Sequence, residues 1–255
     1  MKWHLIEYGV QTGKENMDID ISLARSCGQD EAFFRLYGWN PYCISLGANQ
    51  KFEDIDTERT SKESIDIVRR PTGGRAILHA EEITYSVIIP YSHELTPKKI
   101  YKAVSLALIE GLKLYDPVFG ELSLEDENPH FPSLLQQPEG VLCFGSAAKN
   151  EIKFRGKKIV GSAQRKMDKV ILQHGSILCG RFHRRLPEFV AVDDSTRRSL
   201  SKEMDDKTIE IEAITNTKTD YGRLSECLKE GFSKFWEINF ESVKNSKSAF
   251  SFQQS

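Results

Sequence analysis

Residues 151–178 read EIKFRGKKIVGSAQRKMDKVILQHGSIL and carry the clearest strand signal in the chain. Apolar and β-branched residues recur there in three runs, at 151–154, 158–164 and 170–178. Arg155-Gly156 is a turn signal that folds the first run back onto the second. Strands joined by such short connections pair in the antiparallel sense. The segment therefore predicts a sheet built from hairpins.

Further strands are predicted towards the N-terminus, at 33–37, 43–46, 65–68, 77–78 and 84–89. The first two flank a turn at Gly38-Trp39-Asn40-Pro41. The third runs directly into a glycine-rich loop, and we expect the last two to continue the same sheet.

Three helices are predicted from apolar residues at helical spacing. The first has Asn16 as its candidate cap and ends before Gly28, the second opens at Pro97, and the third is capped by Asp220. An irregular connection is expected over residues 116–140, where four prolines occur.

Strands and helices are mixed, with tight hairpins in place of regular βαβ alternation. We therefore predict an α+β fold with a large mixed, mostly antiparallel sheet flanked by helices. Residues 1–244 are expected to form one domain, and residues 245–255 a polar tail.

Composition narrows the range of functions. The chain has 255 residues, of which 39% are hydrophobic, and 35 basic against 37 acidic side chains give a net charge of -2. The chain therefore has no overall positive potential of the kind that predicts nucleic-acid binding. No signal peptide or membrane-spanning stretch is visible, so we expect a cytoplasmic protein without a membrane partner. The five cysteines contain no CxxC pair, which predicts neither a disulfide framework nor a metal site.

Three segments contain residues suited to chemistry. Residues 69–79, RRPTGGRAILH, place unshielded backbone N–H groups beside hydroxyl, guanidinium and imidazole groups, although this segment alone favours a glycine turn with solvated arginines. Residues 143–165 contain Cys143-Phe144 and the run GKKIVGSAQ from Gly156 to Gln164, whose small residues indicate a close approach to the backbone. Residues 173–177, QHGSI, form the third segment.

Together these segments resemble the lipoate protein ligase and octanoyltransferase family, over about residues 16–178. Residues 69–79 meet the family's RR-x-[ST]-GG-x-A-x-x-H pattern, and residues 156–163 meet its G-[RK]-K-[IV]-x-G-[SN]-A pattern. The resemblance implies a smaller sheet packed beside the large one. It also implies Lys158 as the catalytic lysine and a set of substrate-binding residues, namely Arg70, Thr72, Gly73, Gly74, His79, Gly161, Ser162, Ala163, His174 and Gly175.

Within this family, ligases activate free lipoate with ATP, whereas octanoyltransferases take octanoyl from acyl carrier protein through a cysteine thioester. Cys143, 15 residues before Lys158, is similar to the transferase cysteine. This implies transfer to a lysine of a lipoyl carrier, such as the glycine-cleavage H protein, without a cofactor.

A free cysteine thiol has a pKa near ~8.5 and is mostly protonated at neutral pH. The ammonium of Lys158, at ~4 Å and an effective dielectric of ~20, would favour the thiolate by up to ~4 kcal/mol before desolvation is subtracted. The glycines are expected to hold the acyl carbonyl.

Other roles follow for the remaining candidates. His79 and His174 are expected to shape the site rather than act as general bases, and Trp39 is either an acyl-pocket residue or a core residue. Cys27, Cys43, Cys179 and Cys227 are expected to be small buried thiols.

Several departures and alternatives stay open. Ala80 and residues 145–149 depart from the family pattern, whereas Arg75 favours the transferase branch. An ATP-dependent ligase with an accessory subunit in place of the usual C-terminal domain, a lipoyl or octanoyl amidotransferase and a non-catalytic binder of lipoyl domains remain alternatives.

Overall fold

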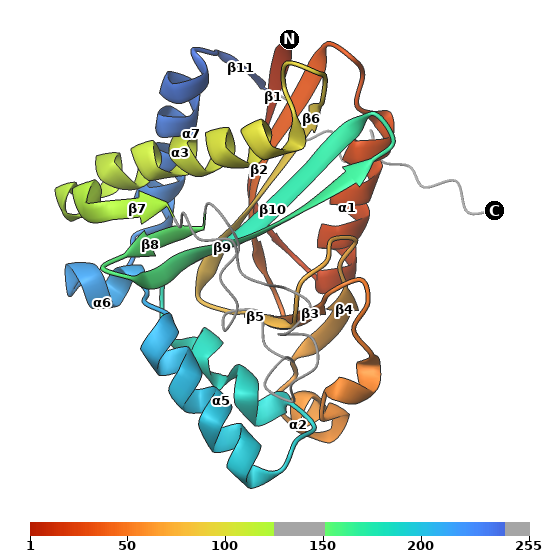
Figure 1. Ribbon diagram of the computed structural model, residues 1–255, viewed down its shortest axis with the longest axis vertical. Coiled ribbons are helices and arrows are strands. Elements are labelled where there is room, and N and C mark those ends of the chain that lie inside the picture. Colours follow the sequence, from red (N-terminus) through yellow and green to blue (C-terminus); the bar gives the residue numbers. More distant parts are fainter. Residues whose placement is uncertain (125–150, 243–255) are drawn as a thin grey trace.

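The computed structural model describes residues 1–124 and 151–242, and two sheets organise them (Figure 1). The large sheet has eight strands in the order β11-β1-β2-β6-β10-β9-β8-β7. β1 pairs parallel with both of its neighbours, and the other five pairings are antiparallel. The predicted mixed, mostly antiparallel sheet is confirmed. Its strands are β1 Lys2–Gln11, β2 Glu31–Trp39, β6 Glu82–Pro90, β7 Leu122–Leu124, β8 Ile152–Phe154, β9 Lys157–Met167, β10 Val170–Leu178 and β11 Phe240–Ser242.

The small sheet has the order β4-β3-β5, formed by Asp66–Arg69, Cys43–Leu46 and Ile77–His79. The expectation that residues 77–78 and 84–89 continue one sheet is therefore wrong, because β5 and β6 belong to different sheets. Glu81, with a φ of 51°, turns the chain between them. Its carbonyl accepts the N–H groups of Cys179 and Gly180, which fixes this turn against the end of β10.

The helices are α1 Gly13–Ser26, α2 Thr57–Lys62, α3 Pro97–Tyr115, α5 Asp194–Lys207, α6 Ile211–Thr215 and α7 Tyr221–Trp236. The described residues also contain three 3-10 helices, η1 Phe52–Asp54, η2 Pro117–Glu121 and η5 Phe182–Phe189. The predicted starts at Pro97 and Asp220 are confirmed. Asn16 is not the cap of α1: the cap is Thr12, four residues earlier, which forms a capping box with Glu15, and Asn16 is buried inside the helix.

The connection predicted to be irregular contains regular structure in its first part, since η2 and β7 lie within residues 117–124. The rest of it falls outside the described residues, as does the predicted tail at 245–255.

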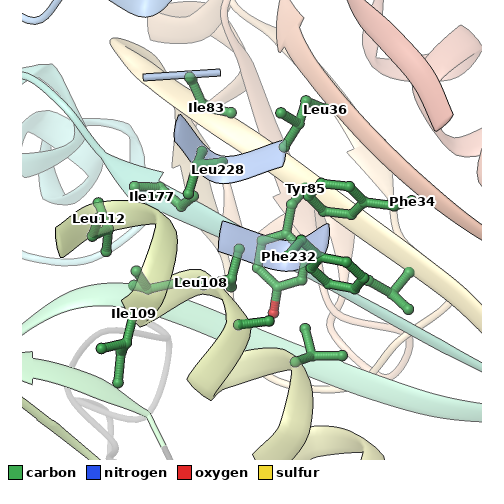
Figure 2. Close-up of a cluster of buried hydrophobic side chains, with 14 of the residues drawn as sticks. Phe34, Leu36, Ile83, Tyr85, Leu108, Ile109, Leu112, Ile177, Leu228 and Phe232 are labelled. Atoms are coloured by element: carbon green, nitrogen blue, oxygen red, sulfur yellow. The ribbon is translucent and has the colours of Figure 1, made fainter. Parts of the chain in front are cut away.

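One face of the large sheet is apolar and is covered by α3 and α7 (Figures 1 and 2). Phe34 of β2 stacks on Phe232 of α7 with ring centroids 4.2 Å apart. The two helices approach so closely at Gly231 that a Cβ atom added there would lie 2.1 Å from the backbone nitrogen of Gly111. The apolar face predicted for the helix at Pro97 is buried in this core, through Ile100, Val104, Leu108, Leu112 and Tyr115.

The other face of the large sheet is covered by α1 and the small sheet, and it is unusually polar. The paired strands β6 and β10 place Ser86 opposite His174 and Thr84 opposite Ser176 on this face. All four side chains are buried. Buried polar groups need hydrogen-bond partners, so this layer between the two sheets is the place where a functional site is expected. Among the described residues, none of the helices is long and apolar enough to cross a membrane.

Candidate functional site

A buried carboxylate organises one end of the polar layer. Asp20, in the middle of α1, has no exposed surface. Its Oδ1 accepts hydrogen bonds from the Arg35 guanidinium and the Ser86 hydroxyl, both at 2.8 Å, and its Oδ2 accepts one from Tyr37 at 3.1 Å. Burial by itself would raise the pKa of Asp20, but Arg35 and the hydrogen bonds from His174 and Ser86 lower it below its usual value. Asp20 is therefore ionised and joins α1 to β2 and β6.

His174 links this carboxylate to the glycine-rich loop. Its Nδ1 lies 3.5 Å from Asp20 Oδ2, and its Nε2 lies 2.6 Å from Thr72 Oγ1. Burial lowers the pKa of His174, and the attraction of Asp20 offsets only part of this effect. A neutral imidazole that donates from Nδ1 accepts the Thr72 proton at Nε2. His174 thus holds Thr72 in place.

Arg70 fixes the rest of the loop from inside. Its guanidinium donates to the carbonyls of Ser45, Gly73 and Arg75, at 2.8, 2.9 and 2.6 Å. Gly74 has a φ of 91°, a conformation that favours glycine. The two adjacent glycines thus lie in a loop whose shape is set by a buried arginine.

A second histidine relay lies on β5. His79 Nδ1 is 2.8 Å from Glu82 Oε1, and its Nε2 is 2.7 Å from Ser45 Oγ. Trp39 stacks on the imidazole, with ring centroids 4.0 Å apart, and donates its N–H to Thr84 at 2.7 Å. His79 therefore has a partner on each side and a fixed orientation.

Between these two relays lies a small cavity that is partly open to solvent. Met17, Tyr37, Trp39 and Ile77 supply its apolar surface. Six of the predicted site residues also line it: Arg70, His79, Gly161, Ala163, His174 and Gly175. Trp39 lines this cavity and is almost fully buried, and its contact with an acyl chain stays a prediction. The small residues of β9 leave space that larger side chains would fill.

An irregularity in β9 determines where Lys158 points. Ile152 of β8 pairs with Val160, but the next residue, Lys153, pairs with Lys158, so Ile159 is an extra residue in β9. Such a bulge lets two consecutive side chains face the same way. Ile159 and Val160 both enter the apolar core. Lys158 consequently lies on the same face of the sheet as Gly161 and Ala163, although it does not line the cavity itself.

Lys158 is buried and forms an ion pair. Its Nζ lies 3.0 Å from Glu151 Oε2, and each side chain is only 3% exposed. The Lys158 backbone is fixed as well, because it forms a parallel bridge with Thr208 and its carbonyl accepts the N–H of Ile209 at 3.0 Å. A carboxylate this close opposes the field of the ammonium. The stabilisation of a nearby thiolate is therefore smaller than the estimate for an isolated lysine.

The remaining candidates lie as follows. Thr72, Gly73 and Gly74 lie beside the cavity and do not line it. The Ser162 side chain points to the opposite face of the sheet, where its hydroxyl lies 2.7 Å from the Tyr85 hydroxyl. Cys143 falls outside the described residues.

The other cysteines differ in burial. Cys43 and Cys179 are buried as expected, whereas Cys27 and Cys227 are only partly buried, so the expectation is wrong for these two. Burial raises the pKa of all four thiols, that of Cys27 to about 11. They are protonated at neutral pH and are poor nucleophiles.

Sequence reasoning missed several residues of the polar layer, among them Asp20, Ser45, Glu82 and Glu151. Asp20 lies in the helix predicted behind Asn16. The signal that marks it is a carboxylate on the apolar stripe of that helix, between Met17 and Leu23, where a charge requires a partner. Within residues 1–124 and 151–242, no group of three or more potential metal ligands is present.

A family model described as the lipoyl protein ligase A/B catalytic domain matches residues 12–233. The chain belongs to this family. It is 34% identical to octanoyltransferase LipM of Geobacillus kaustophilus, over 94% of this chain and 88% of the relative. It is 31% identical to octanoyltransferase LipM of Staphylococcus aureus, over 95% and 90% of the two chains.

Solved structures of lipoate protein ligases share the fold. The bi-partite lipoate protein ligase of Thermoplasma acidophilum superimposes with a TM-score of 0.73 over 96% of this chain and 88% of that one. Its sequence identity of 20% supports a common fold and no more. The predicted α+β architecture, with a small sheet beside the large one, is that of the lipoyl protein ligase A/B catalytic domain.

Proposed function

We propose that this member of the lipoyl protein ligase A/B family transfers an octanoyl group to a lysine of a lipoyl carrier protein. The observation that carries the proposal is its likeness to octanoyltransferases over nearly the whole chain, at 31 to 34% identity. The donor in this proposal is octanoyl-acyl carrier protein, and the acceptor is a lipoyl-domain protein such as the glycine-cleavage H protein.

The cavity supports an acyl substrate. Met17, Tyr37, Trp39 and Ile77 offer an apolar surface to an alkyl chain. Arg70, His79 and His174 are already held by hydrogen bonds to neighbouring residues, so they shape the cavity.

In the proposed reaction, Cys143 is the nucleophile and Lys158 the cation that favours its thiolate. The Cys143 sulfur bonds to the octanoyl carbon, and the carrier thiol leaves with the proton. The acceptor amine then bonds to the same carbon, loses its proton and releases the Cys143 thiol. Thioester exchange is suited to this order because a thiolate is both a good nucleophile and a good leaving group. Backbone N–H groups near Gly73 and Gly161 are suited to stabilising the oxyanion.

The deciding experiment is an intact-mass measurement after incubation with octanoyl-acyl carrier protein, with and without ATP. We expect one added octanoyl group without ATP, which hydroxylamine removes as it does from a thioester. Labelling that requires both ATP and free acid would assign the chain to the ligase activity instead. An adduct that forms from an octanoylated lipoyl domain and not from acyl carrier protein would identify an amidotransferase.

Replacement of the nucleophile gives the second test. We expect Cys143→Ser to fold normally and to lose transfer to the acceptor, because a serine hydroxyl is not appreciably ionised. Cys179→Ser and Cys227→Ser are the matched controls and should keep their activity. Near-normal activity of Cys143→Ser would refute the covalent mechanism.

A further inference from the structure

A surface groove that the proposed reaction does not use lies between the C-terminal end of α1 and the tip of the β9–β10 hairpin (Figure 1). Its lining includes buried apolar residues, such as Ala24 of α1 and Val170 of β10. Asp168 is the only carboxylate among the described residues that line it. Both walls contribute cations to the lining, namely Arg25, Arg165, Lys166 and Lys169.

These four cations produce a local positive field. All four are exposed, and within residues 1–124 and 151–242 none of them forms an ion pair. Exposed cations elsewhere do form such pairs, as Lys14 does with Asp18 at 2.6 Å. Four cations against one carboxylate leave an excess of positive charge in the groove, although the whole chain has a net charge of -2. A concave surface lined by one sign of charge attracts a partner of the opposite sign.

The groove leads to the cavity of the candidate site. Gly161 and Ala163 line the cavity, whereas Arg165 and Met167 line the groove. Alternate residues of a strand share a face, so cavity and groove follow one another along the same face of β9. The step from Ala163 to Met167 covers roughly 13 Å at ~3.3 Å per residue. Arg165 marks the junction, because its guanidinium donates to the carbonyl of Pro71, beside the glycine-rich loop, at 2.6 Å.

We propose that this groove docks the acyl donor through an acidic face of its carrier protein, so that the acyl arm enters the cavity along β9. The inference rests on the proposed function, which names acyl carrier protein as the donor. Charge favours the donor over the acceptor, because the reactive group of the acceptor is a lysine ammonium that the four cations repel. A protein surface also fits better than a small free anion, because the cations are spread over two walls of an open groove.

A double charge reversal tests the groove. Arg25→Glu/Lys169→Glu changes one exposed cation on each wall, and neither residue contributes to the cavity. The matched control is Arg198→Glu/Lys202→Glu, which makes the same change in net charge on the exposed side of α5, away from the groove (Figure 1).

Acylation of the enzyme is followed by intact mass at increasing concentrations of octanoyl-acyl carrier protein. We expect the groove variant to need an about 10- to 100-fold higher donor concentration for half-maximal rate, with the maximal rate unchanged, because charge complementarity acts on association. Added salt should weaken the wild-type protein towards the variant, since it screens exposed charges. The control variant should behave as wild type.

A second donor separates the carrier protein from its arm. Octanoyl-phosphopantetheine has the same thioester and the same phosphate without the protein, and we expect it to acylate the groove variant and the wild-type protein equally well. An equal loss with this small donor would overturn the proposal, because the groove would then act on the arm or on the fold.

Three other results would also refute the proposal. The first is an unchanged concentration dependence of the groove variant with octanoyl-acyl carrier protein. The second is an equal loss in the α5 control, which would mean that only net charge matters. The third is a loss confined to transfer from the acylated enzyme to the lipoyl domain, which would assign the groove to the acceptor.

Failure of the proposed function gives a different result. If the wild-type protein forms no thioester with either donor, that function is wrong, and calorimetric titration with acyl carrier protein still tests the groove. Binding that the groove variant loses and the control keeps would support docking, and an absence of binding to wild type would overturn it. Should the double variant not fold, as judged by circular dichroism, Arg25→Glu and Lys169→Glu are measured singly; each should show part of the loss, and no loss in either would contradict the proposal.

Discussion

His183, in η5, makes the stability of this protein sensitive to acid in a way that can be calculated. The imidazole has no exposed surface, with Nδ1 3.0 Å from the Gly180 carbonyl and Nε2 3.0 Å from Thr208 Oγ1. Burial lowers the pKa of His183 to about 4. Thr208 also pairs with Lys158, so this histidine supports the backbone at the candidate site.

The sign of the effect follows from the two states of the chain. In the unfolded chain the histidine has a pKa near ~6.5, so below that pH protons bind the unfolded state more readily than the folded one. The contribution of His183 is fully present above pH 6.5 and is lost as the pH falls towards 4. The slope is about 1.4 kcal/mol per pH unit, and the total loss is roughly 3 kcal/mol.

The perturbation is His183→Asn, which keeps a donor near the Gly180 carbonyl and removes the titrating group. At pH 7 we expect the variant to be less stable by about 1 to 2 kcal/mol, because a smaller side chain leaves a cavity. At pH 5 the wild-type protein has lost about 2 kcal/mol at this position, so the two proteins should be about equally stable.

Urea unfolding followed by circular dichroism at pH 7, 6 and 5 measures this difference. The exposed His93→Asn is the matched control and should show the wild-type dependence on pH. If His183→Asn differs from wild type by the same free energy at every pH, His183 is not a buried neutral imidazole and the reasoning fails.

Three further outcomes are expected. Gly161→Val should fold normally but lower octanoyl transfer by about 100-fold, because its side chain would occupy the cavity; an unchanged kcat/KM would show that the acyl chain binds elsewhere. Gly231→Ala should lower the unfolding free energy by about 1 to 3 kcal/mol in urea titrations, because its Cβ would meet the Gly111 backbone. Gly120→Ala has nothing within 4 Å of the added atom and should have no effect; equal loss in both variants would contradict the close helix crossing. Thr12→Ala should cost about 1 kcal/mol by removing the α1 cap, and a change below the error of the same titration would contradict the capping box.

Much of the fold was predictable because the relevant signals are local. The hairpin at Arg155-Gly156 needs only two residues with positive φ, and both have it, at 48° and 83°. The helix capped by Asp220 was recognised for the same reason. The assignment of β5 to a separate sheet was not predictable in this way, because the periodicity of a strand does not say which strands it pairs with.

For the same reason, only some residues of the candidate site could be predicted from the sequence. Segments with unusual composition, such as the glycine loop and the Gly161–Ala163 run, were found from the sequence. Asp20, Glu82 and Glu151 were missed because each is an ordinary acidic residue whose importance depends on long-range contacts. Asp20 meets Arg35 and Ser86, the second of them 66 residues away in the chain. α5 was also missed, because it buries only Leu200 and Met204 and has little apolar periodicity.

The bulge in β9 explains why the number of residues between Lys158 and Gly161 matters. In a regular strand, residues three apart lie on opposite faces, yet Lys158 and Gly161 share a face because Ile159 is an extra residue. Substitutions between apolar residues at positions 159 and 160 should therefore be tolerated. Insertion of one residue at this point would turn the lysine towards the apolar core while most strand pairing survives. For protein engineering, the number of residues between the lysine and the glycine is thus a stricter constraint than the identity of those residues.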